Sequence, residues 1–173
     1  MKRTIALTAV VAVLAACQTT SDDAPRATAA LQATKGNKAF GEATFEQVGD
    51  KVRVVVFAQN LPADRELGFH IHEAGDCSSG DGMSAKGHFN PQAKPHAHPS
   101  ATERHAGDML ALKADDYGNA HVDATLDIIT VAPGPTSVVG RGLIVHASPD
   151  DYKTQPTGNA GARLACAIIN RKS

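Results

Sequence analysis

The chain has 173 residues, a net charge of −1, few aromatic residues and no tryptophan. This length is typical of a single domain, and the balanced charge excludes the strongly basic character of a nucleic-acid-binding protein. Fifteen glycines and nine prolines indicate a fold rich in turns.

The N-terminal residues have the pattern of an export signal. Lys2 and Arg3 precede an eleven-residue apolar run at 5–15, which is too short to span a bilayer. We expect a signal peptide over residues 1–16, and its removal changes the net charge from −1 to −3 because both cations are lost. Leu-Ala-Ala before Cys17 resembles the lipobox of bacterial lipoproteins, in which the cysteine is lipidated and becomes the mature N-terminus. An ordinary secretory signal with an incidental cysteine is the alternative.

Alternating apolar and polar residues predict β-strands after a polar tether over residues 17–26. The clearest alternation is at 51–59, where valines occupy every second position. Short strands between turns, with no amphipathic helix of useful length, predict one all-β domain over residues 27–173, an antiparallel sandwich or flattened barrel of about eight strands. The strands are expected at residues 27–33, 38–47, 51–59, 67–72, 109–114, 120–127, 141–147 and 163–169.

Histidines gather around one of these strands and the loop that follows it. Side chains two apart in a strand share a face, so His70 and His72 present neighbouring imidazoles, which suit Cu, Zn, Fe and Ni. Alone, this pair would be read as two surface histidines. The loop from about residue 73 to residue 107 is unusually long unless it is functional, and a bound metal could order it. Further candidate ligands follow: His88, His96, His105, Asp108 and His146.

Several stretches together resemble the bacterial copper/zinc superoxide dismutases of the exported lipoprotein kind, over about residues 27–171. They are GFHIHEAGDC from Gly68, GHFNP from Gly87, ERHAGD from Glu103, GRGLIVH from Gly140 and TGNAGARLAC from Thr157. The resemblance implies a Greek-key β-sandwich, since these enzymes are known examples of that architecture. It also implies dismutation of superoxide to O₂ and hydrogen peroxide with one copper and one zinc per chain.

The resemblance implies a division of the ligands between the two metals. Copper falls to His70, His72, His88 and His146, and zinc to His88, His96, His105 and Asp108. His88 would bridge the metals, leave copper on its reduction, and deliver a proton to the peroxide. Four imidazoles suit Cu(II), and three imidazoles with a carboxylate suit tetrahedral zinc. His98 could replace His96, whereas His121 is expected on the surface.

The resemblance also assigns supporting residues. Asp150 would hold one copper histidine and one zinc histidine, with Asp151 as its competitor. Arg163 would attract and orient superoxide, and an ordinary strand-end arginine is the alternative. Because an exported compartment is oxidising, we expect Cys77 and Cys166 to form a disulfide.

The same resemblance favours the periplasmic side of a bacterial envelope, with a lipid anchor on Cys17 in the outer membrane. The enzyme would protect the envelope from superoxide. The resemblance leaves open whether the chain forms a homodimer. A copper-storage module is the alternative function. Storage needs neither Arg163 nor Asp150, so these two residues favour the enzyme. An adhesive or structural envelope domain on the same sandwich is a third.

Overall fold

The structure, a computed structural model, describes residues 24–172. The expected signal peptide and Cys17 lie outside these residues. Within them, no helix combines the length and apolar character needed to cross a membrane.

The described chain is built from strands, as the sequence predicts. The strands are β1 (Arg26–Ala33), β2 (Phe40–Val48), β3 (Lys51–Gln59), β4 (Glu66–Leu67), β5 (Phe69–His72), β6 (Leu112–Lys113), β7 (Ala120–Leu126), β8 (Gly142–His146), β9 (Arg163–Ile168) and β10 (Asn170–Lys172), with a short 3₁₀ helix at Met83–Ala85. The prediction of an all-β fold is confirmed.

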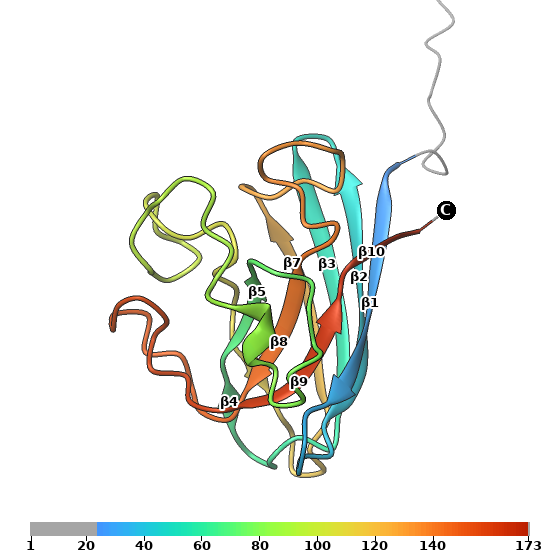
Figure 1. The fold of residues 1–173 in the computed structure, drawn as a ribbon, viewed down its shortest axis with the longest axis vertical. Coiled ribbons are helices and arrows are strands. Elements are labelled where there is room, and N and C mark those ends of the chain that lie inside the picture. The colour runs from blue at the N-terminus through green and yellow to red at the C-terminus, as the bar shows by residue number, and fades with distance from the viewer. Residues whose placement is uncertain (1–23, 173) are drawn as a thin grey trace, which may run out of the picture.

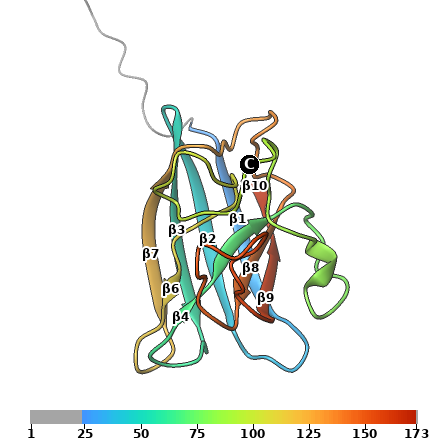
Figure 2. The ribbon, with the colours of Figure 1, turned by 90° about the vertical axis from the view of Figure 1, so that its left-hand side faces the viewer.

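Eight of these strands form one antiparallel sheet that curls into two facing layers. The order is β5-β8-β9-β1-β2-β3-β7, with β10 paired to β1. Strand β1 joins the layers, because residues 26–31 pair with β2 while Gln32 and Ala33 pair with β9. Figures 1 and 2 show the sheet bending around this strand. The expected sandwich is therefore present.

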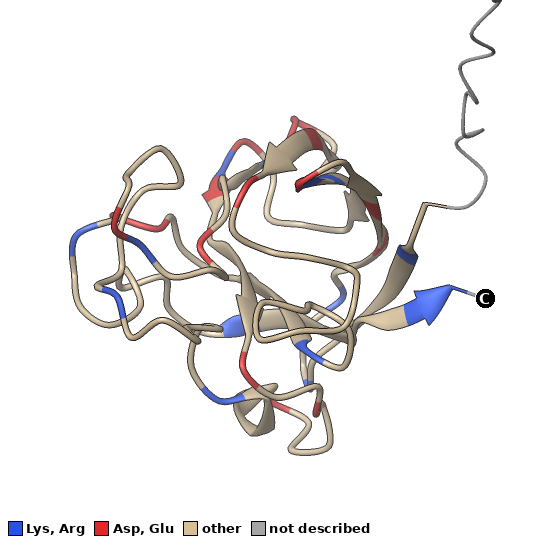
Figure 3. Cartoon of the chain, turned by 90° about the horizontal axis from the view of Figure 1, so that it is seen from above, with Lys and Arg blue, Asp and Glu red and all other residues tan. Residues whose placement is uncertain are grey.

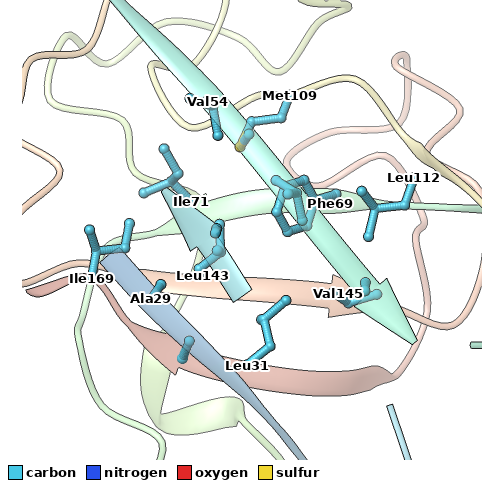
Figure 4. Packing of buried hydrophobic residues seen from close by; sticks show 14 of the residues in the cluster. Ala29, Leu31, Val54, Phe69, Ile71, Met109, Leu112, Leu143, Val145 and Ile169 are labelled. Carbon is cyan, nitrogen blue, oxygen red and sulfur yellow. The ribbon is translucent and has the colours of Figure 1, made fainter. Parts of the chain in front are cut away.

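The core fills the space between the two layers. Val52, Val54 and Val56 of β3 are fully buried, as their alternation predicts. Phe69 and Ile71 of β5 are also fully buried and face the same cluster (Figure 4). Burial of each such side chain contributes about 1.5–3 kcal/mol, so this packing holds β5 firmly against β3.

Two strand predictions are wrong in their bounds. The strand expected at 67–72 is divided into β4 and β5, because β4 pairs with β6 whereas β5 pairs with β8. The strand expected at 109–114 shrinks to the two residues of β6. There the Ala111 N–H donates to the Tyr152 hydroxyl at 3.0 Å instead of to a neighbouring strand. Strand β10 was not among the expected strands, which end at residue 169.

Two long loops leave the paired strands β5 and β8 and project from the same side of the molecule, on the left in Figure 1. The loop at 73–111 follows β5, and the loop at 147–162 joins β8 to β9. A disulfide between Cys77 and Cys166 ties the first loop to β9, as predicted.

Acidic and basic residues are interspersed around the molecule, as Figure 3 shows. Some form cross-strand pairs, such as Arg53 with Asp123 at 2.5 Å and Lys113 with Glu66 at 2.9 Å. Exposed pairs of this kind contribute at most about 1 kcal/mol each, so the core and not the surface charge holds the sheet together.

Candidate metal centre

Strand β5 is buried on both faces. Phe69 and Ile71 point into the hydrophobic core, so the alternation of a strand turns His70 and His72 to the opposite side. Both histidines are 0% exposed. Two imidazoles therefore stand side by side in an environment shielded from solvent.

The free edge of β5 brings two further ligand candidates from the long loop. His88 pairs with His72, and Asp108 pairs with His70, as isolated antiparallel β-bridges. The main-chain N–H and carbonyl of Ile71 each make a hydrogen bond to this loop, at 3.0 and 2.9 Å. Because directly opposed residues of an antiparallel pair lie close together, these bridges set both side chains beside the β5 histidines.

One group of candidate ligands contains four imidazoles whose nitrogens lie within 4.8 Å of one another: His70, His72, His88 and His146. His72 Nδ1 donates to the Lys86 carbonyl at 2.8 Å, and His146 Nδ1 faces the Gly161 carbonyl at 3.3 Å. The Nε2 atoms of these two histidines are thereby left to face each other, 3.3 Å apart. Four imidazole nitrogens suit Cu(II).

The other two imidazoles of this group each carry a buried nitrogen without a hydrogen-bond partner among the described residues: His70 Nδ1 and His88 Nε2. Their second ring nitrogens are occupied, His70 Nε2 by Asp150 at 2.6 Å and His88 Nδ1 by Asp108 at 2.9 Å. A buried unpaired polar atom costs about 1–3 kcal/mol. A metal ion bound by the group would satisfy both atoms, so these residues fit copper.

The second group consists of His88, His96, His105 and Asp108. Nδ1 of each histidine lies near Asp108 Oδ1, at 2.9 Å for His88, 2.8 Å for His96 and 3.4 Å for His105. Ligands about 2.0–2.1 Å from a tetrahedral zinc would be roughly 3.3–3.4 Å apart, so His105 already has that separation, while His88 and His96 are hydrogen-bonded to Asp108 and would move away from it by about 0.5 Å to share zinc. Three imidazoles and a carboxylate suit a closed zinc site, and His88 belongs to both groups through different ring nitrogens.

Two further histidines lie outside both groups. His98 is exposed, and its Nδ1 is 2.8 Å from the Ser100 hydroxyl. His121 is also exposed and stacks on Phe57, with ring centroids 4.4 Å apart. The structure therefore brings His96, and not His98, to the zinc group.

A single carboxylate, that of Asp150, makes a hydrogen bond to one histidine of each group. Asp150 accepts from His70 Nε2 at 2.6 Å and from His96 Nε2 at 2.9 Å. Asp151 is exposed and does not contact either ring. Gly158 packs against this bridge, because a Cβ on it would lie 1.7 Å from Asp150 Oδ1. Gly158 lies within one of the stretches that carry the family resemblance, but its residue type alone did not mark it as part of the site.

Burial sets the protonation of the copper-side histidines. Desolvation lowers the pKa of His88 to about 4 and that of His146 to about 3, and also lowers the pKa values of His70 and His72. These imidazoles are therefore neutral at pH 7. Neutral imidazole is the form that binds metals.

In the zinc group, hydrogen bonds outweigh burial in setting the pKa of His96. Burial alone would lower the pKa of His96, but its hydrogen bonds to Asp108 and Asp150 raise it to about 9. Burial alone would likewise raise the pKa of both carboxyls, yet hydrogen bonds from the histidines hold them well below their usual range. The bridging carboxylates are therefore ionised and can balance a cation.

Arg163 begins β9 beside the copper group. Its guanidinium donates to the carbonyls of Gly82 and Lys86, at 2.5 Å each. The Lys86 carbonyl also accepts from His72, so one oxygen links the arginine to a candidate copper ligand. The half-buried guanidinium is the fixed cation at this end of the centre.

Two metal-binding groups that share one imidazole, set on a curled β-sandwich, define a dinuclear metalloprotein. The family model for copper/zinc superoxide dismutase matches residues 39–169. The chain is 42% identical over 139 residues to "Superoxide dismutase [Cu-Zn] 1" of Aquifex aeolicus, covering 78% of this chain and 82% of that one. It is 39% identical over 137 residues to "Superoxide dismutase [Cu-Zn]" of Cryptococcus neoformans var. grubii, covering 75% and 88%.

A solved structure agrees with this relationship. The crystal structure of "the clock protein EA4" has a TM-score of 0.76 and 39% identity, and the match covers 84% of this chain and 93% of that one. The chain belongs to the copper/zinc superoxide dismutase family. It is an oxidoreductase of the superoxide dismutase class whose cofactors are copper and zinc.

Proposed function

We propose that this centre converts two superoxide anions and two protons into O₂ and hydrogen peroxide. Copper would be held by His70, His72, His88 and His146, and zinc by His88, His96, His105 and Asp108. The two unpaired buried nitrogens, His70 Nδ1 and His88 Nε2, are the observation that carries the proposal, because both belong to the group assigned to copper.

Copper held there would supply the one-electron redox chemistry that the reaction needs. His88 supplies the proton step. Its Nδ1 is directed to the zinc group and its Nε2 to the copper group. A proton held at Nε2 is therefore at the reacting side and can pass to the peroxide, so no separate general acid is needed.

Arg163 would bind and orient the anion. Its guanidinium is fixed by two carbonyls, and the Lys86 carbonyl links it to His72 by accepting a hydrogen bond from each. A planar, permanently charged group with restricted motion suits a small anion better than a mobile ammonium. Asp150 would keep the His70 and His96 rings in place for both metals.

Copper storage is the second candidate, and it makes a different prediction. Storage requires ligands but no fixed cation beside them. The test is the decay of superoxide with purified, copper- and zinc-loaded protein, compared with buffer and with the zinc-only protein. We expect rapid decay with both metals present. Decay no faster than in buffer would support storage instead.

For the location, we propose export to the periplasmic side of the envelope and retention by a lipid on Cys17, with residues 27–173 as the catalytic domain. Several acyl chains give stable membrane attachment, whereas one gives only marginal binding. The outer membrane is favoured because Gln18, and not an aspartate, follows the cysteine. The Cys17→Ala variant should leave the membrane fraction and appear in the soluble one. Equal retention of variant and parent would contradict the anchor.

A further inference from the structure

Tyr152 has a backbone conformation that is uncommon for a bulky residue. It lies in the loop between β8 and β9, two residues after the bridging Asp150, and its φ is +55°. Residues other than glycine, asparagine and aspartate seldom take this left-handed conformation, and strain of this kind gathers at functional sites. The side chain is half-buried.

The backbone of Tyr152 holds the carboxylate that joins the two metal groups. Its N–H donates to Asp150 Oδ1 at 2.7 Å. The same oxygen accepts from His96 Nε2 at 2.9 Å, while Oδ2 accepts from His70 Nε2 at 2.6 Å. The turn at Tyr152 therefore fixes the rotation of the carboxylate, and with it the direction of both imidazoles.

The side chain of Tyr152 contacts the other segments that surround the zinc group. Its ring is nearly parallel to that of His96, with an interplanar angle of 16° and centroids 6.3 Å apart, and meets His98 edge-on at 4.7 Å. Its hydroxyl accepts from the Ala111 N–H at 3.0 Å and lies 3.4 Å from the Met109 carbonyl. One side chain thus links the loop at 147–162 to two parts of the loop at 73–111.

Tyr152 also separates the centre from solvent. It lines a surface groove of about 520 Å³ with His98, Leu110 and His121. On the inner side His96 is only 2% exposed. The ring therefore stands between the groove and a candidate zinc ligand.

We propose that Tyr152 is a positioning residue for zinc: its N–H orients Asp150, its ring restrains His96, and its hydroxyl fastens the loop. The inference rests on the proposed zinc group. Groups that orient metal ligands typically change metal affinity by about 10–100-fold when they are removed. Loss of Tyr152 should therefore weaken zinc more than it weakens the fold.

The chain contains its own control in Tyr117, the other of its two tyrosines. The Tyr117 N–H donates to Asp115 Oδ1 at 3.0 Å, two residues back, which is the hydrogen-bond pattern that joins Tyr152 to Asp150, although Tyr117 does not have the positive φ of Tyr152. Tyr117 is 81% exposed and lies in the turn before β7, away from both metal groups. Replacing it removes a tyrosine whose N–H makes the same kind of hydrogen bond, without touching the centre.

The test is zinc competition against a chelator with the full-length protein. We expect Tyr152→Leu to bind zinc about 10–100-fold more weakly than the parent, and Tyr152→Phe to recover much of the loss because it keeps the ring. Leucine at this φ carries backbone strain just as tyrosine does. The difference in zinc affinity between Tyr152→Leu and the parent therefore reports the loss of the ring and the hydroxyl. Tyr117→Leu should match the parent.

A second readout uses tyrosine fluorescence, because the chain has no tryptophan. In a Tyr117→Phe protein the emission comes from Tyr152 alone, and it should change until one zinc per chain is bound. In Tyr152→Phe, zinc should leave the emission unchanged.

The outcomes separate this inference from the proposed function. Parental zinc affinity in Tyr152→Leu, even with a lowered melting temperature, would show that Tyr152 only stabilises the fold and would overturn the inference. Failure of the parent itself to bind zinc would overturn the zinc group, and the inference with it.

Discussion

At the scale of single residues, His88 is the group on which both halves of the centre depend. The sequence predicts its importance through the family resemblance, which implies that His88 bridges the two metals. It cannot predict that Nδ1 would face Asp108 while Nε2 stays unpaired, since this depends on the β-bridge between His72 and His88. Ring orientation arises from tertiary contacts and not from spacing.

Two substitutions should separate the metals. His146 belongs only to the copper group and sits on β8, so His146→Ala should lose copper and abolish activity while zinc and the fold remain. Asp108→Ala should lose zinc first, because its carboxylate contacts all three zinc-side histidines. Metal content after equal loading measures both effects. If both variants lose the same metal, the division of ligands is wrong.

Arg163 permits a test of anion guidance. A single charge at about 5–6 Å contributes roughly 1–3 kcal/mol at an effective dielectric near 20–40, and each 1.4 kcal/mol is tenfold in rate. Arg163→Ala should therefore lower activity about ten-fold or more with metal content unchanged, and Arg163→Lys should restore part of it.

Salt provides the control for this residue. The parent should lose rate between about 10 and 150 mM salt, as the screening length falls from about 30 to 8 Å, and the Ala variant should lose less. If the Arg163→Ala protein binds both metals and keeps the parent's rate, Arg163 does not guide the anion and is only a charge at the end of a strand.

At the scale of elements, local patterns predict those strands whose main-chain groups pair only with other strands. The alternation at 51–59 gives β3 with its bounds intact, because valines at every second position suit a half-buried strand. The prediction at 109–114 fails because the Ala111 N–H and the Met109 carbonyl are engaged by the Tyr152 hydroxyl. Those contacts come from a distant loop, so no local pattern contains them.

The loop at 147–162 can be tested at Gly158. A Cβ there would collide with Asp150 Oδ1 at 1.7 Å and with His96 Nε2 at 2.6 Å. Gly158→Ala should therefore displace the carboxylate and weaken zinc binding by about ten-fold or more, as zinc competition would measure.

Gly49→Ala is the matched control. Gly49 has φ +61°, close to the +65° of Gly158, but a Cβ there meets nothing within 4 Å. Both variants carry similar backbone strain, and only Gly158→Ala disturbs the bridge. Equal zinc affinity in the two variants would mean that the bridge does not depend on this close approach.

At the scale of the whole molecule, the histidines should give the metal-free protein a stability maximum near pH 6.5. The folded pKa values of His88 and His146, about 4 and 3, lie below the unfolded value, so stability falls as pH drops below about 6.5. The folded pKa of His96, about 9, lies above the unfolded value. Its contribution to the free energy of unfolding is therefore fully present below about pH 6.5 and is lost as the pH rises through 9.

Urea midpoints of the metal-free protein measured at about pH 4.5, 6.5 and 8.5 test this balance. The midpoint at pH 6.5 should be the highest, and His96→Gln should flatten the alkaline decline without removing the acid one. A higher midpoint at pH 4.5 than at 6.5 would contradict the assignment of neutral, buried histidines.

The most direct test of the whole account is a crystal structure of the copper- and zinc-loaded protein, with anomalous diffraction recorded at each metal's absorption edge. The account predicts one copper peak among His70, His72, His88 and His146. It also predicts one zinc peak among His88, His96, His105 and Asp108, with the His88 ring between the two metals. Both metals in one group, or a His88 ring that contacts neither, would contradict it.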